Sequence, residues 1–192
     1  MSELPPQFLE QVERLMKAAE GESQRAKIIL FATQIDETLR ELLTKFLKPH
    51  RAKKEKDDEM FRAFAPLSTF ASRIALAYRL GLISKDDADA FDILRDIRND
   101  CAHKIFEFAL TKPPHSEHLQ RFATLTAQDP TRAFMLAALA CPKTDEECFI
   151  YCCIVHVLYL HEATARIAQC PDVFAKDLVR IKRQFDERAI VA

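Results

Sequence analysis

Arg98, Asn99 and His103 form a short polar block inside a stretch that is otherwise rich in apolar residues. An imidazole exchanges protons near neutral pH, and a guanidinium holds a phosphate through its planar fork of N–H donors. The block could therefore carry out acid–base chemistry on a phosphate ester, or it could bind a partner. A structural role is a third alternative, because Asn99 and His103 are four residues apart and can bond each other on one side of a helix.

The neighbouring apolar residues predict a helix over residues 85–102 and fix the directions of these side chains. One apolar stripe is formed by Ala90, Ile93, Leu94, Ile97 and Cys101. At about 100° per residue, Asn99 and His103 fall roughly 150 to 170° from the centre of this stripe, and Arg98 falls roughly 70° from it. Arg98 and His103 are thus about 140° apart, and one chain would hold both on one phosphate only if the helix ends or bends before His103.

Other polar residues extend the surface opposite the stripe. Asp92 lies on the same face as Asn99 and His103, and Arg95 and Asp96 flank it. We expect these five residues to form an interaction surface for a second element or a second subunit. The polar face and the many amphipathic helices favour a homodimer.

The composition predicts an all-α, single-domain, multi-helix bundle. The chain has 192 residues, of which 48% are hydrophobic and 30% charged, enough for one sizeable core. Only two glycines occur, whereas a sheet protein of this length needs more glycine-based turns. Apolar spacing and caps predict further helices over residues 5–20, 22–47, 67–80, 117–128, 145–169 and 171–188, with a partly helical segment at 131–140.

Two adjoining segments carry a resemblance to a known family. They are LSTFASRIALAYRLGLIS at 67–84 and FDILRDIRNDCAHKIFEF at 91–108. Together they resemble the mannitol operon repressor (MtlR) family, whose helical core looks like a divergent HEPN-type bundle with an R-x4-H signature. The resemblance is strongest at residues 26–108, and it implies a transcriptional regulator of sugar-alcohol (mannitol) use. The sequence has no helix-turn-helix signature or zinc finger, so regulation would work through protein contacts and not through sequence-specific DNA binding.

The same resemblance implies an alternative from the enzyme class, a metal-independent HEPN-type endoribonuclease or a toxin-like RNA-binding protein. His103 would then act as general acid or base, and Arg98 would hold the scissile phosphate, with Asn99 beside them. A twofold pairing of two chains would bring these residues to a shared cleft. Under this alternative, the partner of the protein would be RNA.

The cysteines and the N-terminal segment predict the compartment. The first residues are acidic and polar without an apolar signal segment, so we expect a cytoplasmic protein with reduced thiols. Cys148 and Cys152 stand among apolar neighbours and are interpreted as small buried hydrophobes, with no metal site and no cofactor. The apolar run CFIYCCIVHVLYL is too short to cross a bilayer and predicts a core helix. The basic stretch KPHRAKKEKDD at 48–58 is typical of a solvated loop.

Overall fold

The chain folds as an all-α bundle in the part that its structure, a computed structural model, describes: residues 6–47, 59–104, 108–139 and 142–169. The elements in chain order are α1 (Pro6–Ala19), α2 (Gln24–Phe46), the short 3-10 helix η1 (Glu59–Phe61), α3 (Phe70–Arg79), α4 (Lys85–His103), α5 (His115–Gln128), α6 (Pro130–Ala138) and α7 (Asp145–Gln169). The predicted fold class is confirmed. The predicted basic loop and the last predicted helix lie outside the described residues.

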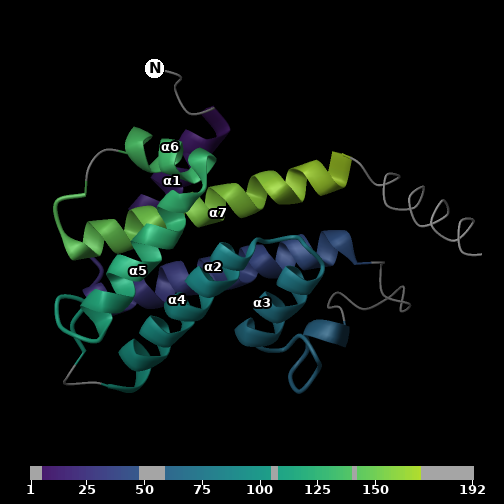
Figure 1. Cartoon of the computed structure of the whole chain (residues 1–192), viewed down its shortest axis with the longest axis horizontal. Helices are drawn as coiled ribbons and strands as arrows, with labels where there is room; N and C mark the ends of the chain where they lie inside the picture. Colours follow the sequence, from purple (N-terminus) through teal and green to yellow (C-terminus); the bar gives the residue numbers. More distant parts are fainter. Residues whose placement is uncertain (1–5, 48–58, 105–107, 140–141, 170–192) are drawn as a thin grey trace, which may run out of the picture.

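The long helices α2 and α7 form the centre of the bundle and share its most extensive contact. Figure 1 shows α3 and α4 on one side of this pair, with α1 and α6 on the other. Helix α4 packs against α2, α3 and α5, and α5 also packs against α7. The apolar stripe of α4 faces inward as predicted, since Ala90, Ile93, Leu94, Ile97 and Cys101 are all buried.

Local signals place the ends of α3 and α4 close to their predicted positions. Ser84 accepts a hydrogen bond from the Asp87 backbone N–H, and the Asp87 carboxylate accepts one from Ser84 N in a capping box. Thr69 caps α3 in the same way. Gly81 follows α3 with a φ of 70°, a conformation that costs a residue with a Cβ about 1 kcal/mol or more.

Helix α7 spans the predicted residues and is a core helix. Cys152 and Cys153 are buried and Cys148 is half-buried, so the interpretation of Cys152 as a small buried hydrophobe is confirmed. By length and composition alone, the segment Asp145–Ile167 could cross a membrane, with a mean hydropathy of 1.4. More than half of that stretch is buried inside the protein, as in the core helix of a bundle.

A buried polar network ties the start of α4 to α6 and α7. The Arg132 guanidinium donates to the Asp87 carboxylate, and both side chains are almost fully buried. Arg132 also donates from Nε to Thr126 O at 3.1 Å and from Nη2 to Leu125 O at 3.4 Å. His156 Nε2 lies 3.1 Å from Thr126 Oγ1. Asp87 is therefore more than a first-turn acid that complements the helix dipole, because its side chain joins three segments of the core.

Candidate interaction surface on α3 and α4

The polar block of α4 faces outward, away from the core. Arg98 and His103 are exposed and Asn99 is half-buried, whereas Ile97 and Cys101 of the apolar stripe are fully buried. His103 is exposed as the helical wheel predicted. Arg98, predicted at the border of the core, is more exposed than Asn99, which was predicted on the far side. Residues 105–107, which complete the segment that carries the resemblance, lie outside the described residues.

Helix α4 continues through His103 without a break that would bring His103 round to Arg98. Its C-cap is Lys104, whose N–H donates to Asp100 O at 2.8 Å. Arg25 from α2 donates to the carbonyls of Cys101 and Lys104, the latter at 3.0 Å, and so satisfies acceptors that the end of a helix leaves free. A single chain thus keeps Arg98 and His103 on different sides of α4.

The structural alternative for the polar block is realised in other contacts than the bond between Asn99 and His103. Among the residues that the structure describes, these two side chains form no hydrogen bond with each other, and Asp96 pairs with Arg95. Arg98 lies close enough to Asp36 of α2 for its charge to act on that carboxylate. The contact that holds this end of α4 to the following loop involves Asp100. Its Oδ2 atom lies 2.7 Å from Lys104 Nζ and 3.1 Å from His115 Nε2.

The electrostatics of Asp100 follow from these two partners. Hydrogen bonds from Lys104 and then from His115 lower the pKa of the Asp100 carboxyl below its usual value. His115 is buried and also reaches Ala109 O at 3.3 Å. Sequence reasoning missed this contact, because no helical spacing links Asp100 to a residue in the turn that begins α5.

A groove of about 380 Å³ lies between α3 and α4. Its floor is made of small or branched apolar side chains: Ala71, Ile74 and Ala75 from α3 and Ala88 from α4. Ala71 is half-buried and Ala75 is exposed, so the floor is open to solvent. Tyr78, which is 47% exposed, stands at the wall on the α3 side. Small residues at neighbouring positions of two packed helices leave this concave surface.

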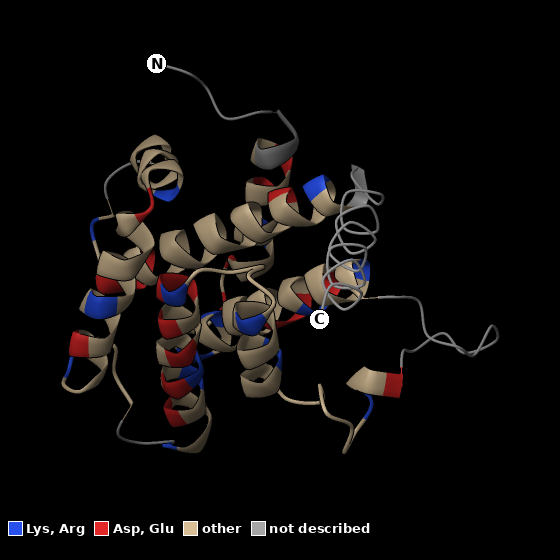
Figure 2. Ribbon diagram, turned by 45° about the vertical axis from the view of Figure 1, so that its right-hand side comes forward, with Lys and Arg blue, Asp and Glu red and all other residues tan. Residues whose placement is uncertain are grey.

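Two ion pairs form the α4 side of the groove. Lys85 Nζ lies 2.6 Å from Asp89 Oδ2, and Arg95 Nη1 lies 2.7 Å from Asp92 Oδ1. Arg95 also reaches Asp96 Oδ1 at 3.3 Å. Figure 2 shows many acidic and fewer basic positions along α4. Asp92 and Arg95 thus belong both to the predicted interaction surface and to the rim of the groove, and Asp96 is joined to this rim through Arg95.

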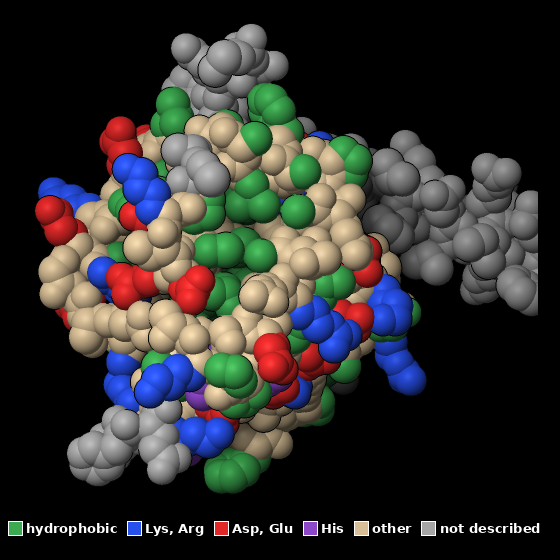
Figure 3. Space-filling view, turned by 60° about the vertical axis from the view of Figure 1, so that its left-hand side comes forward, with side chains coloured by type: hydrophobic (Ala, Val, Ile, Leu, Met, Phe, Trp, Pro, Cys, Tyr) green, Lys and Arg blue, Asp and Glu red, His purple; other side chains and the backbone are tan. Residues whose placement is uncertain are grey.

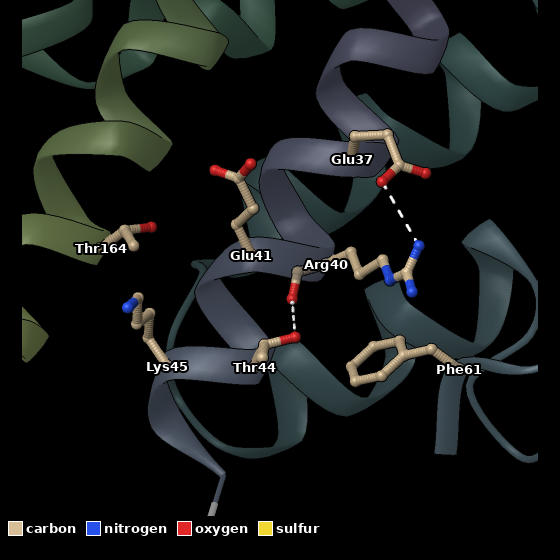
Figure 4. Close-up of a pocket in the computed structure, with 7 residues that line it drawn as sticks. All are labelled: Glu37, Arg40, Glu41, Thr44, Lys45, Phe61 and Thr164. Atoms are coloured by element: carbon tan, nitrogen blue, oxygen red, sulfur yellow. Dashed lines mark hydrogen bonds and ion pairs between the residues drawn. The ribbon is translucent and has the colours of Figure 1, made fainter. Parts of the chain in front are cut away.

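A second concavity of about 410 Å³ lies over the C-terminal half of α2, between α7 and η1 (Figure 4). Its lining residues are Glu37, Arg40, Glu41, Thr44, Lys45, Phe61 and Thr164. Arg40 lies between Glu37, at 3.6 Å, and the ring of Phe61, whose centroid is 5.4 Å from the guanidinium carbon. Glu41 and Lys45 point towards the α7 side, where Thr164 lies. Both signs of charge line the pocket, so its chemistry selects no single class of ligand.

The protein is a helical bundle, and the groove between its helices α3 and α4 has an apolar floor and a charged rim. No protein-family model matches this sequence, and no curated protein matches it. Among solved structures, it is similar to the X-ray structure of the MtlR–HPr complex from Escherichia coli. The match has 21% sequence identity and a TM-score of 0.49, and it covers 84% of this chain and 98% of that chain. This is a distant likeness of helical architecture, and it assigns no role to any residue.

The exposure of the polar block predicts that its removal leaves the fold intact. We expect Arg98→Ala and His103→Ala to change the free energy of unfolding by no more than about 0.5 kcal/mol, as is usual for surface substitutions. Urea denaturation of both variants measures this change. Cleavage of a mixed RNA pool in EDTA, followed in parallel, tests the nuclease alternative. Metal-free cleavage that both well-folded variants lose would establish that alternative.

Proposed function

We propose that this chain is a cytoplasmic regulatory protein that acts through protein contacts made at the α3–α4 groove. The observation that carries the proposal is the groove itself, a concave apolar floor beside a rim of oriented ion pairs. Protein interfaces combine an apolar centre with a polar rim in the same way. The groove also borders the surface predicted from the sequence, since Asp92 and Arg95 belong to both.

The surface charges support protein binding more than binding to a polyanion. On the face that Figure 3 shows, Lys and Arg side chains lie interspersed with Asp and Glu. Four of the charged residues near the groove, Lys85, Asp89, Asp92 and Arg95, already form pairs. Nucleic acid binding depends on cations that neutralise phosphates, and a cation already paired with a carboxylate contributes less to it.

The process that the protein regulates is proposed from the sequence resemblance. Residues 67–84 and 91–108 resemble the mannitol operon repressor family and include six of the nine residues that line the groove, all except Lys85, Ala88 and Asp89. We infer that the protein controls the expression of genes for sugar-alcohol use, and that it does so as part of a protein complex.

Blocking the groove tests this proposal. Ala75 is exposed on the groove floor, so Ala75→Arg should fill the groove without disturbing the core. In a host that lacks the gene, we expect the wild-type gene to restore the mannitol-dependent change in transcript levels, and the Ala75→Arg gene to fail. Ala137→Arg, at an exposed position of α6, is the matched control and should behave as wild type. Full restoration by Ala75→Arg would refute a role for the groove.

A further inference from the structure

Phe64 combines a strained backbone with a completely exposed aromatic ring. Its φ is 66°, in the left-handed region, and its side chain is fully exposed, with a relative exposure of 103%. The left-handed conformation costs a residue with a Cβ roughly 1 to 2 kcal/mol. Exposing the ring gives up the stabilisation that a buried phenylalanine supplies. Among the residues that the structure describes, no side-chain contact of Phe64 offsets either cost, which points to a role outside the protomer.

The segment around Phe64 is held firmly at both of its ends. Leu67 N donates to Met60 O at 2.9 Å, and Ala65 N donates to Arg62 O at 3.0 Å, so the segment closes into a compact turn. On one side of the turn, Phe61 is buried, with the guanidiniums of Arg40 and Arg73 over its ring at 5.4 and 5.9 Å from the centroid.

On the other side of the turn, Arg73 anchors the chain where it enters α3. Its Nε donates to Leu67 O at 2.9 Å, and its Nη2 donates to Ser68 O at 3.3 Å. Arg73 also pairs with Asp36 of α2. The turn therefore fixes the backbone at Phe64 and holds its side chain away from the protein surface. An ordered backbone reduces the conformational entropy that is lost on binding, and aromatic residues and arginine are the usual anchors of protein interfaces.

The α3–α4 groove has the shape and the charge to receive this anchor. Its floor of alanines and Ile74 is apolar, and its volume of about 380 Å³ exceeds what a benzyl group occupies. The accessible charges of α4 between 85 and 96 are four aspartates, Asp86, Asp89, Asp92 and Asp96, against Lys85 and Arg95, so this side is acidic. The exposed side chain two residues before Phe64 is the cation Arg62.

We propose that the groove receives a second copy of this chain, with Phe64 of each protomer inserted into the α3–α4 groove of its partner and Arg62 facing the partner's acidic rim. The inference rests on the proposed function, because it names the occupant of the same groove. The contact occurs twice about a twofold axis, which closes the assembly as a dimer. A rigid, strained turn suits a protein groove of defined shape, whereas a lipid surface accepts an apolar side chain in any orientation.

The mass of the full-length protein in solution tests the proposal. We expect sedimentation and light scattering to show twice the protomer mass of 22.0 kDa at micromolar concentration. Phe64→Ala and Ala75→Arg should each weaken the dimer by about 100-fold or more, since the first removes the apolar anchor and the second fills the groove at both copies of the contact. Phe64→Gly should do the same while folding at least as well, because glycine adopts a positive φ without strain. Phe134→Ala, at an exposed phenylalanine of α6, is the matched control and should leave the dimer unchanged.

An exchange of charges between two variants tests whether Arg62 of one protomer faces the acidic rim of the other. Arg62→Glu places an anion against the acidic rim, and Asp92→Arg places a cation against the partner's Arg62, so each variant alone should be largely monomeric. In an equimolar mixture of the two variants, positions 62 and 92 carry opposite charges at both contacts of the heterodimer. We therefore expect the mixture to form dimers. Salt should weaken this recovery.

Several outcomes would overturn the proposal. These are a wild-type monomer at tens of micromolar, a dimer that persists in Phe64→Ala, and a mixture of the two charge variants that stays monomeric. Binding of the monomer to anionic vesicles through Phe64 would assign the turn to a lipid surface and would also overturn it. These measurements use purified protein, so their failure is distinguishable from a failure of the groove variant to restore gene regulation in the host.

Discussion

Arg132→Met is expected to lower the free energy of unfolding by about 3 to 5 kcal/mol. The substitution removes the guanidinium that pairs with Asp87, and both side chains are at most 2% exposed. The remaining carboxylate would be a buried charge without its cation, although it still accepts hydrogen bonds from Ser84 N and Oγ at 2.9 and 2.7 Å. The loss includes the hydrogen bonds from Arg132 to two backbone carbonyls at the end of α5.

Chemical denaturation of three variants measures this effect. The double variant Asp87→Asn with Arg132→Met should recover part of the lost stability, because an amide at position 87 carries no charge and still accepts a hydrogen bond from Ser84 N. Arg98→Met, on the exposed side of the same helix α4, is the control and should lie within about 0.5 kcal/mol of wild type. A loss below about 1 kcal/mol for Arg132→Met would contradict the assignment of this pair as a main support of the core.

Mild acid is expected to destabilise the protein through His156. Burial, and then the nearby charge of Arg132, lower the pKa of His156 from 6.5 to about 3. Asp87 Oδ1 lies 3.7 Å from His156 Nδ1 and would favour the imidazolium, but the same carboxylate already pairs with Arg132. Thr126 Oγ1 donates to Phe122 O at 2.8 Å, so it accepts from His156 Nε2–H, and the proton of the neutral imidazole therefore lies on Nε2.

The sign of the effect follows from proton uptake. Below about pH 6.5 the unfolded chain binds a proton at His156, whereas the folded protein does so only near pH 3, so unfolding is favoured as the pH falls. The stabilising contribution is complete above pH 6.5 and is lost progressively towards pH 3. The loss amounts to about 1.4 kcal/mol per pH unit, or about 2 kcal/mol at about pH 5.

Denaturation of wild type and His156→Gln between about pH 7.5 and pH 5 isolates this contribution. Glutamine does not titrate, so the variant should start less stable but lose about 2 kcal/mol less than wild type over this range. Other groups, such as Asp100 with its lowered pKa, contribute equally to both proteins and cancel in the comparison. Equal losses in the two proteins would show that His156 takes up its proton in the folded state as well.

Local signals in the amino-acid sequence predict the helices of this protein. The spacing from Ala90 to Cys101 defined the buried side of α4, and Ser84 and Gly81 set its start and the end of α3. The apolar residues from 145 to 169 defined α7 over its full length. These patterns act within a few residues of the chain, so no knowledge of the packing is needed. The same periodicity placed Asn99 and His103 away from the core.

The contacts between polar side chains of different helices depend on the packing of the whole bundle. Asp87 and Arg132 are 45 residues apart, and Asp100 and His115 are in different helices, so no spacing along one helix predicts either contact. The groove depends on how closely α3 approaches α4, and the exposure of Phe64 depends on a turn fixed by Arg73 from the following helix. Sequence periodicity says which side of a helix is apolar. It does not say which helix covers that side, because that is settled by the packing of segments far apart in the chain.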